Sequence, residues 1–129
     1  MFNNKGQSLI LFVLILPILM LALVLVVDVG KIVVLKSELN NISDIVLDYG
    51  LSNLDNENIK DELINLVTLN KNDIDKVVIN IEDEKIYIEL TEKSDGIFSS
   101  FIDLPVFNVR SSSVGYIEND KKRIERMGD

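Results

Sequence analysis

The chain has 129 residues, and a length of this kind makes one folded domain the default expectation. With 21 acidic and 13 basic residues its net charge is −8, so binding to the phosphates of nucleic acids is not expected. The absence of His and Cys excludes disulfides, thiol nucleophiles and the usual zinc sites, and no cofactor or metal is expected.

An unbroken apolar run extends from Leu9 to Val27, 19 residues without a charged or polar side chain. As a helix it would reach roughly 28 Å, close to the ~30 Å hydrocarbon core of a bilayer. We therefore predict a transmembrane helix over residues 8–28, preceded by a short leader-like segment at 1–7. Pro17 lies inside this run, and a kink is expected near Val13 to Pro17.

A cleaved secretory signal is the alternative interpretation of the same run. Signals of that class have an apolar region of about 7–15 residues followed by a small-x-small cleavage site. Here the run is longer and leads into Val26-Val27-Asp28-Val29-Gly30 without an Ala-x-Ala pattern. We therefore expect the segment to remain in the membrane. Charge does not decide its orientation, because Lys5 and the terminal amine on one side nearly balance Lys31 and Lys36 on the other.

Beyond Gly30 the apolar residues change to a helical period, at Leu35, Leu39, Ile42, Val46 and Tyr49. The helix is expected to continue out of the membrane, with a bend at Gly30 and a stop at Gly50. This apolar stripe has two interpretations that can hold together. It packs against the domain's own sheet, or it packs against other subunits of an assembly.

The rest of the chain predicts a small α+β domain. A second helix is expected from a cap at Asp55 or Asn56 to about Thr68. A β-hairpin follows over residues 75–93 with Asp83-Glu84 as its turn, and residues 94–105 suggest a short helical turn. A third strand is expected over residues 106–117, and residues 118–129 form a charged, frayed tail. The fold class is thus a transmembrane helix continuing into an amphipathic helix, a second helix and a small antiparallel sheet.

Catalytic chemistry is not indicated anywhere in the sequence. The serines at 111–113 have no His to activate them, and no Gly-rich phosphate loop is present. The acidic turn at residues 82–84 is typical of a solvated loop, and Asn70 to Asp75 lack the Gly and Glu of a calcium loop. We do not expect an enzyme.

The N-terminal block resembles the TadE/TadG-like minor pilins, or pseudopilins, of bacterial tight-adherence (Tad/Flp) pilus systems. The likeness covers roughly residues 5–40 and lies in an ordered set of short motifs. These are Gly6-Gln7-Ser8, Phe12-Val13-Leu14, Leu16-Pro17 and Val27-Asp28-Val29-Gly30-Lys31. In that family a basic-Gly-polar start leads into an apolar helix with an internal Leu-Pro and a closing Val-Asp-x-Gly-basic.

The resemblance implies a single-pass protein with residues 1–7 in the cytoplasm and an extracytoplasmic pilin-like domain at 29–117, at the cell surface or in a surface filament. Its partners would be the lipid bilayer and, through the N-terminal helix, other pilin-like subunits or pilus platform proteins. It also implies a candidate prepilin peptidase cut between Gly6 and Gln7. Such helices usually carry Glu at the fifth place after that Gly, where a carboxylate can neutralise a neighbouring subunit's amine. Leu11 occupies the place here.

Three alternatives follow from Leu11: a processed pilin-like subunit, an uncut TadG-like anchor, or a subunit at the tip of a pilus. Pro17, Asp28 and Gly30 are the residues expected to shape the helix for assembly. Asp28 is either a helix-end carboxylate at the membrane surface or a contact to Lys or Arg on a partner helix. The alternative function is a membrane-tethered extracellular binding module that enters no filament.

Overall fold

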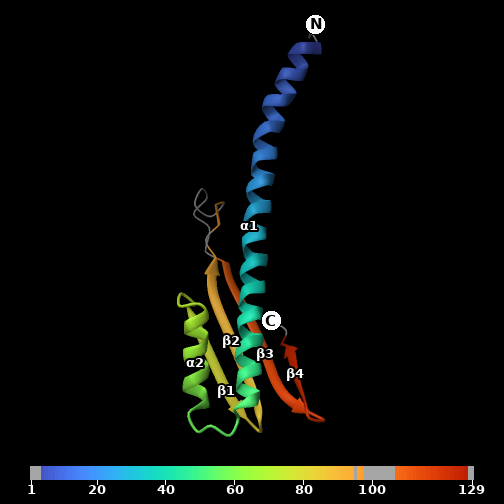
Figure 1. Ribbon diagram of the computed structural model, residues 1–129. Coiled ribbons are helices and arrows are strands. Elements are labelled where there is room, and N and C mark those ends of the chain that lie inside the picture. The colour runs from blue at the N-terminus through green and yellow to red at the C-terminus, as the bar shows by residue number, and fades with distance from the viewer. Residues whose placement is uncertain (1–3, 95, 98–106, 128–129) are drawn as a thin grey trace.

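The computed structural model describes residues 4–94, 96–97 and 107–127. A single long helix, α1 (Asn4–Ser52), carries an α+β domain on its C-terminal half and leaves its N-terminal half projecting away (Figure 1). The remaining elements are α2 (Ile59–Asn70), β1 (Lys76–Glu82), β2 (Lys85–Ser94), β3 (Phe107–Glu118) and β4 (Lys121–Arg126). The predicted fold class is confirmed.

The helix α1 is continuous through both positions where a distortion was expected. Pro17 lies inside it, and Gly30 does not interrupt it. In Figure 1 the N-terminal part leans away from the axis of the lower part. The predicted stop at Gly50 is wrong, since α1 runs on to Ser52. Gly50 serves packing instead: a Cβ there would lie 2.6 Å from Ile86 Cδ1 and 3.2 Å from Leu63 Cδ1.

The second helix begins later than predicted. Its N-cap is Asn58, which makes no side-chain capping hydrogen bond, and it ends at Asn70. Asn56 has another role, because its side chain donates to Glu62 Oε1 at 2.9 Å and accepts from the Asn58 N–H at 2.9 Å. Asn56 therefore orders the turn that precedes the helix.

The four strands form one antiparallel sheet in the order β1-β2-β3-β4. The predicted hairpin is confirmed, with Glu82 opposite Lys85 around the Asp83-Glu84 turn. Both turn residues have positive φ, 50° and 63°, which is the signature of a type I′ turn built here without glycine. The predicted helical turn at 94–105 lies largely outside the described residues.

The predicted frayed tail is wrong for residues 121–126, which form β4 and pair with β3. A second turn of positive φ, at Asn119 and Asp120, makes this hairpin, with Glu118 opposite Lys121. On the side facing α1, Arg126 pairs with Asp44 at 2.8 Å and Lys122 with Asp48 at 3.0 Å. These ion pairs give the charged strand a partner that its own sequence does not indicate.

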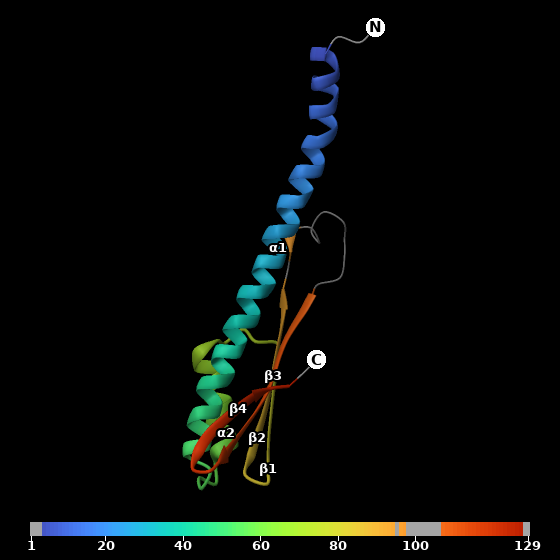
Figure 2. The ribbon, with the colours of Figure 1, turned by 90° about the vertical axis from the view of Figure 1, so that its right-hand side faces the viewer.

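Both helices lie on the same face of the sheet, and the core lies between the helices and the sheet (Figure 2). Its buried apolar residues come from all elements except β4, with Ile124 packed at its margin. They are Leu39, Ile42, Val46, Leu47, Leu51, Ile59, Leu63, Val67, Ile79, Ile86, Ile88, Leu90 and Val109. Three residues of the predicted stripe, Leu39, Ile42 and Val46, therefore do face the domain's own sheet.

Two of the three glycines of α1, Gly30 and Gly50, test how closely the helix is packed. A Cβ at Gly30 would meet nothing within 4 Å, whereas one at Gly50 meets two fully buried side chains. Replacing either by Ala improves helix propensity by about 1 kcal/mol. We expect Gly50→Ala to lower the free energy of unfolding relative to Gly30→Ala by about 1–3 kcal/mol, because the added methyl overpacks the core. Denaturant unfolding of the detergent-solubilised chain measures this, and equal stabilities would contradict it.

Candidate functional site

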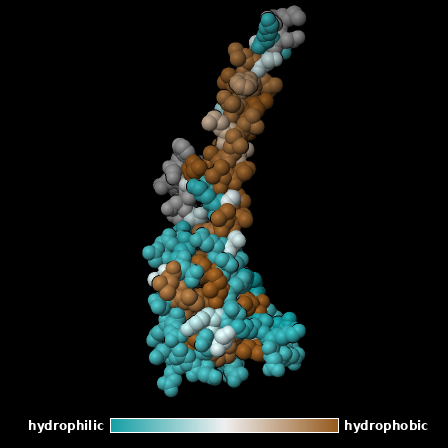
Figure 3. Space-filling view, viewed as in Figure 1, coloured by the Kyte–Doolittle hydropathy of each residue, from teal (hydrophilic) through white to brown (hydrophobic). Residues whose placement is uncertain are grey.

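The N-terminal half of α1 exposes apolar side chains on every side. Its most apolar window of 18 residues has a mean hydropathy of 3.4, and none of that window is buried within the chain. Figure 3 shows this part as a continuous hydrophobic rod above a largely hydrophilic domain. A core helix of a soluble protein would be covered, so this is a single N-terminal helix suited to span a membrane.

The candidate residues at the start of the helix lie far from those at its end. Gly6 and Gln7 are in the first turns of α1, and Leu11 follows with 58% of its surface exposed. Asp28 is 22 residues beyond Gly6, or about 33 Å along the helix. The structure therefore does not bring the candidate cleavage site and the Asp28-Gly30 motif together; they mark opposite ends of the span.

Asp28 is buried, with only 6% of its surface exposed, at the point where the apolar run ends. Its Oδ1 accepts a hydrogen bond of 2.8 Å from the backbone N–H of Ile97. A Cβ at Gly96 would lie 2.7 Å from Oδ2, so only glycine allows this approach. The contact joins α1 to the residues that follow β2, within the same chain. The sequence alone does not indicate this contact, because Gly96 and Ile97 are 68 and 69 positions away from Asp28.

A polar seam joins α1 to β3, and sequence reasoning missed this as well. Ser111 Oγ donates to Asn40 Oδ1 and lies 3.4 Å from Ser43 Oγ, while Ser113 Oγ accepts from Arg126 Nη1 at 3.0 Å. These serines are fully buried. The alternation of Val109, Ser111, Ser113 and Gly115 is the signal that could have found it, because small residues on one strand face let a helix lie close. The serines thus have structural partners.

A cluster of charges holds the end of α2 against α1 and β2. Lys71 Nζ lies 3.5 Å from Glu38, 3.2 Å from Asp73 and 3.4 Å from Glu92, and its side chain is only 16% exposed. Burial opposes the charged form of Lys71, but the hydrogen bond to Asp73 and the nearby carboxylates raise its pKa overall. The pKa of Glu92 is raised because burial of its carboxylate outweighs the attraction of Lys71.

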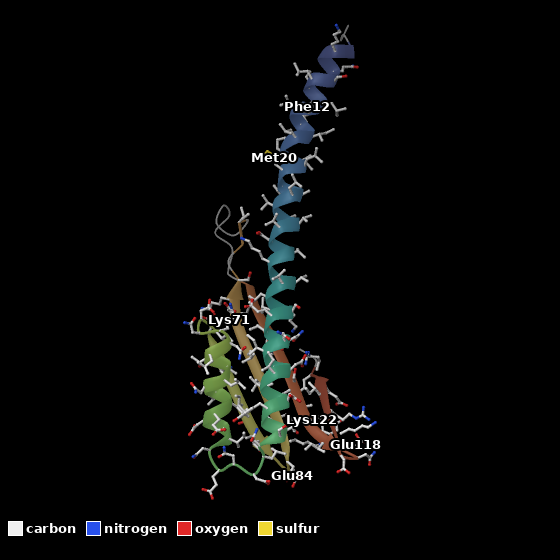
Figure 4. All side chains as sticks on the ribbon, viewed as in Figure 1. Phe12, Met20, Lys71, Glu84, Glu118 and Lys122 are labelled. Atoms are coloured by element: carbon white, nitrogen blue, oxygen red, sulfur yellow. The ribbon has the colours of Figure 1, made fainter. Side chains whose placement is uncertain are left out.

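In the described part of the chain, no group of three or more His, Cys, Asp or Glu side chains is arranged to hold a metal ion. The main geometric feature is an exposed apolar helix whose C-terminal half packs into the core of a small domain. The Asp28 junction and the Lys71 cluster are two of the contacts near the end of the domain that faces the apolar half of α1, and Figure 4 shows Lys71 at that end.

Comparison with known proteins finds one family match, and it lies within α1. Residues 6–44 match the family described as "Putative Flp pilus-assembly TadE/G-like". The match covers most of α1 and includes Gly6, Gln7, Pro17, Asp28 and Gly30. No curated protein and no solved structure matches the chain.

The Asp28 junction can be tested by amide hydrogen exchange at Ile97. Hydrogen bonds to charged groups contribute about 1.5–3 kcal/mol, so Asp28→Ala is expected to speed exchange of that amide roughly tenfold or more. Asp48→Ala removes an exposed carboxylate from the same helix and serves as the control. If exchange at Ile97 is the same in all three proteins, the junction does not hold that segment.

The Lys71 cluster predicts a loss of stability at alkaline pH. The folded pKa of Lys71 is raised above its ordinary 10.5, so its contribution is full below that pH and is lost as pH rises through the folded pKa. Lys71→Met should therefore lower the free energy of unfolding by about 1–3 kcal/mol at neutral pH. Above about pH 10.5 the variant should lose less further stability than the parent chain does. Denaturant unfolding across this pH range gives both values.

Lys60→Met, at an exposed position of α2, is the matched control, and its stability should follow that of the parent chain at each pH.

Two tyrosines also titrate in this pH range. Tyr49 and Tyr116 donate hydrogen bonds to Glu62 and Glu125, and these bonds raise the pKa of each phenol. Their titration acts in the same direction but is common to all three proteins, so it cancels in the comparison. Parallel pH profiles for Lys71→Met and the parent would refute the assignment.

Proposed function

We propose, from the TadE/G-like segment that residues 6–44 carry, that this chain is a membrane-anchored minor pilin-like component of a Flp/Tad-type pilus assembly apparatus. The observation that supports this most directly is the helix itself, which is apolar all round, uncovered by its own domain and continuous with it. A helix of this kind is covered by lipid and by other helices in the membrane. Its role is structural.

In this proposal the N-terminus is cytoplasmic and the sheet domain is extracytoplasmic. Residues 8–28 span the bilayer, and the domain begins at residue 29, next to the Asp28 junction. Partners are pilin-like subunits or platform proteins that contact the apolar surface of α1. The second candidate function is a membrane-tethered binding module that enters no filament. A hollow on the open face of the sheet favours this candidate.

The proposal is tested by fractionating cells that express a tagged chain at native level. The tagged chain is expected with sheared surface filaments or with the inner-membrane platform, and deletion of the pilus ATPase should remove it from the filament fraction. An unrelated single-pass protein of similar size is the control. Partition with neither fraction would reject a pilus role.

The intact mass of the membrane-extracted chain determines the mature form. We expect the full-length mass, because a cut after Gly6 would leave the charged amine of Gln7 at the start of the apolar helix, and position 11 of a neighbouring copy is Leu and offers no carboxylate to pair with it. Loss of residues 1–6 would instead show processing between Gly6 and Gln7. Loss of about 25–30 residues would show that the helix is an ordinary secretory signal.

A further inference from the structure

The face of the sheet opposite the two helices has a hollow near the membrane-facing end of the domain. Its volume is about 570 Å³, and its charged lining residues are Asp75, Lys76, Glu89, Lys93 and Arg110. They come from the start of β1, the end of β2 and the start of β3, which lie side by side in register. In the part of the chain that the structure describes, both helices pack on the other face (Figure 2).

The carboxylates of the hollow already have partners, whereas two of its lysines do not. Glu89 pairs with Arg110 at 3.6 Å, and Asp75 Oδ2 accepts the backbone N–H of Lys93 at 2.8 Å. The side chains of Lys76 and Lys93 are exposed and take part in none of the ion pairs among the described residues. The hollow therefore presents cations that are available to an anionic ligand.

Its position relative to the bilayer follows from the Asp28 junction. The hydrocarbon span ends at Asp28, and Ile97 is bound to that side chain. Lys93 is four residues before Ile97, so it lies at most about 13 Å from this level along the strand. The headgroup layer extends roughly 5–8 Å beyond the hydrocarbon, and charges act across a Debye length of about 8 Å. Lys93 can therefore reach the headgroups.

The opposite end of the domain carries the complementary feature. Of the two turns that lie farthest from the membrane helix, the β1-β2 turn is acidic, with Glu82, Asp83 and Glu84, whereas Glu118 and Asp120 of the other turn are followed by Lys121 and Lys122. Figure 4 shows Glu84 and Glu118 at this end and Lys71 at the membrane-facing end. An anionic surface would repel the acidic β1-β2 turn and attract the lysines of the hollow, so it would favour this orientation of the domain.

We propose that Lys93 binds the phosphates of anionic lipid headgroups, with Lys76 adding attraction from deeper in the hollow, and so holds the membrane-facing end of the sheet's open face on the membrane that contains α1. This inference goes beyond pilus assembly and needs only the membrane span. Each lysine near an anionic surface is attracted to it, and this attraction weakens as the salt concentration rises. Docking would hold the membrane-facing end of the domain against the bilayer and leave the acidic β1-β2 turn on the aqueous side.

Since the native chain has no Cys, a single fluorescent label can report on the hollow. Asn108→Cys places the label at the rim, opposite Lys93, and Asn58→Cys places it at the far end as the matched control. The full chain is reconstituted in phosphatidylcholine vesicles with or without phosphatidylglycerol. We expect phosphatidylglycerol to reduce quenching of the label at 108 by neutral acrylamide roughly twofold or more, with no change at 58.

The double variant Lys76→Gln/Lys93→Gln should abolish the effect of phosphatidylglycerol on quenching, and high salt should do the same. The control double variant Lys60→Gln/Lys121→Gln, at two exposed lysines far from the hollow, should preserve it. Equal quenching in both kinds of vesicle would overturn the proposal, as would equal loss of the effect in both double variants. If inorganic phosphate protects the label in neutral vesicles, the hollow is a general anion site. If protection of the label rises with the protein-to-lipid ratio and not with lipid charge, the occupant of the hollow is another protein chain.

Discussion

The close approach of α1 to β3 is the contact on which the rest of the domain depends. A Cβ at Gly115 would lie 3.3 Å from both Leu47 Cβ and Leu51 Cδ1, so the helix lies almost directly on the strand. Ser43, Ser111 and Ser113 continue this line of small residues, and each is fully buried. Helix and strand approach so closely only because these positions carry little side chain. The larger aliphatic residues fill the space on the β1 and β2 side, under α2.

This arrangement explains why polar residues occupy the centre of a small core. A serine fills the narrow gap and is satisfied there, since Ser111 bonds Asn40 and Ser113 accepts from Arg126. The same arginine reaches Asp44 and so attaches the outermost strand to the helix. The seam therefore fixes the position of β4 as well as that of β3, although β4 contributes only Ile124 to the margin of the core.

Sequence predicts the parts of this fold whose signals are local. The apolar run of α1 and the alternation of β1 and β2 need only neighbouring residues, and both are confirmed. β4 could not be found in that way, because its stabilising partners Asp44 and Asp48 lie more than 70 positions away. Gly50 was misjudged for a related reason: a glycine that ends a helix and a glycine that admits Ile86 look the same in sequence.

The family segment was predictable to a similar degree, while the roles of its residues stay predictions. The order of Gly6, Pro17, Asp28 and Gly30 along the helix indicated the TadE/G-like segment, and residues 6–44 match that family. Sequence could not provide the partner of Asp28. A carboxylate at the end of a span can pair with lipid headgroups, with a partner helix or with its own chain, and the sequence pattern is the same in each case. Burial decides here, because a carboxylate 6% exposed needs hydrogen-bond donors close at hand, and the Ile97 amide is one.

The junction at Asp28 links the membrane half of the helix to the sheet. From Asn4 to Ser52 the backbone is helical without a break, and the apolar stripe of Leu39, Ile42 and Val46 locks the lower half into the core. The Asp28 contact adds a second attachment some 16 Å above Leu39 along the helix. A rod held at two separated levels cannot tilt relative to the domain without breaking one attachment. Any tilt or rotation of the apolar half of the helix is therefore carried over to the sheet and its open face.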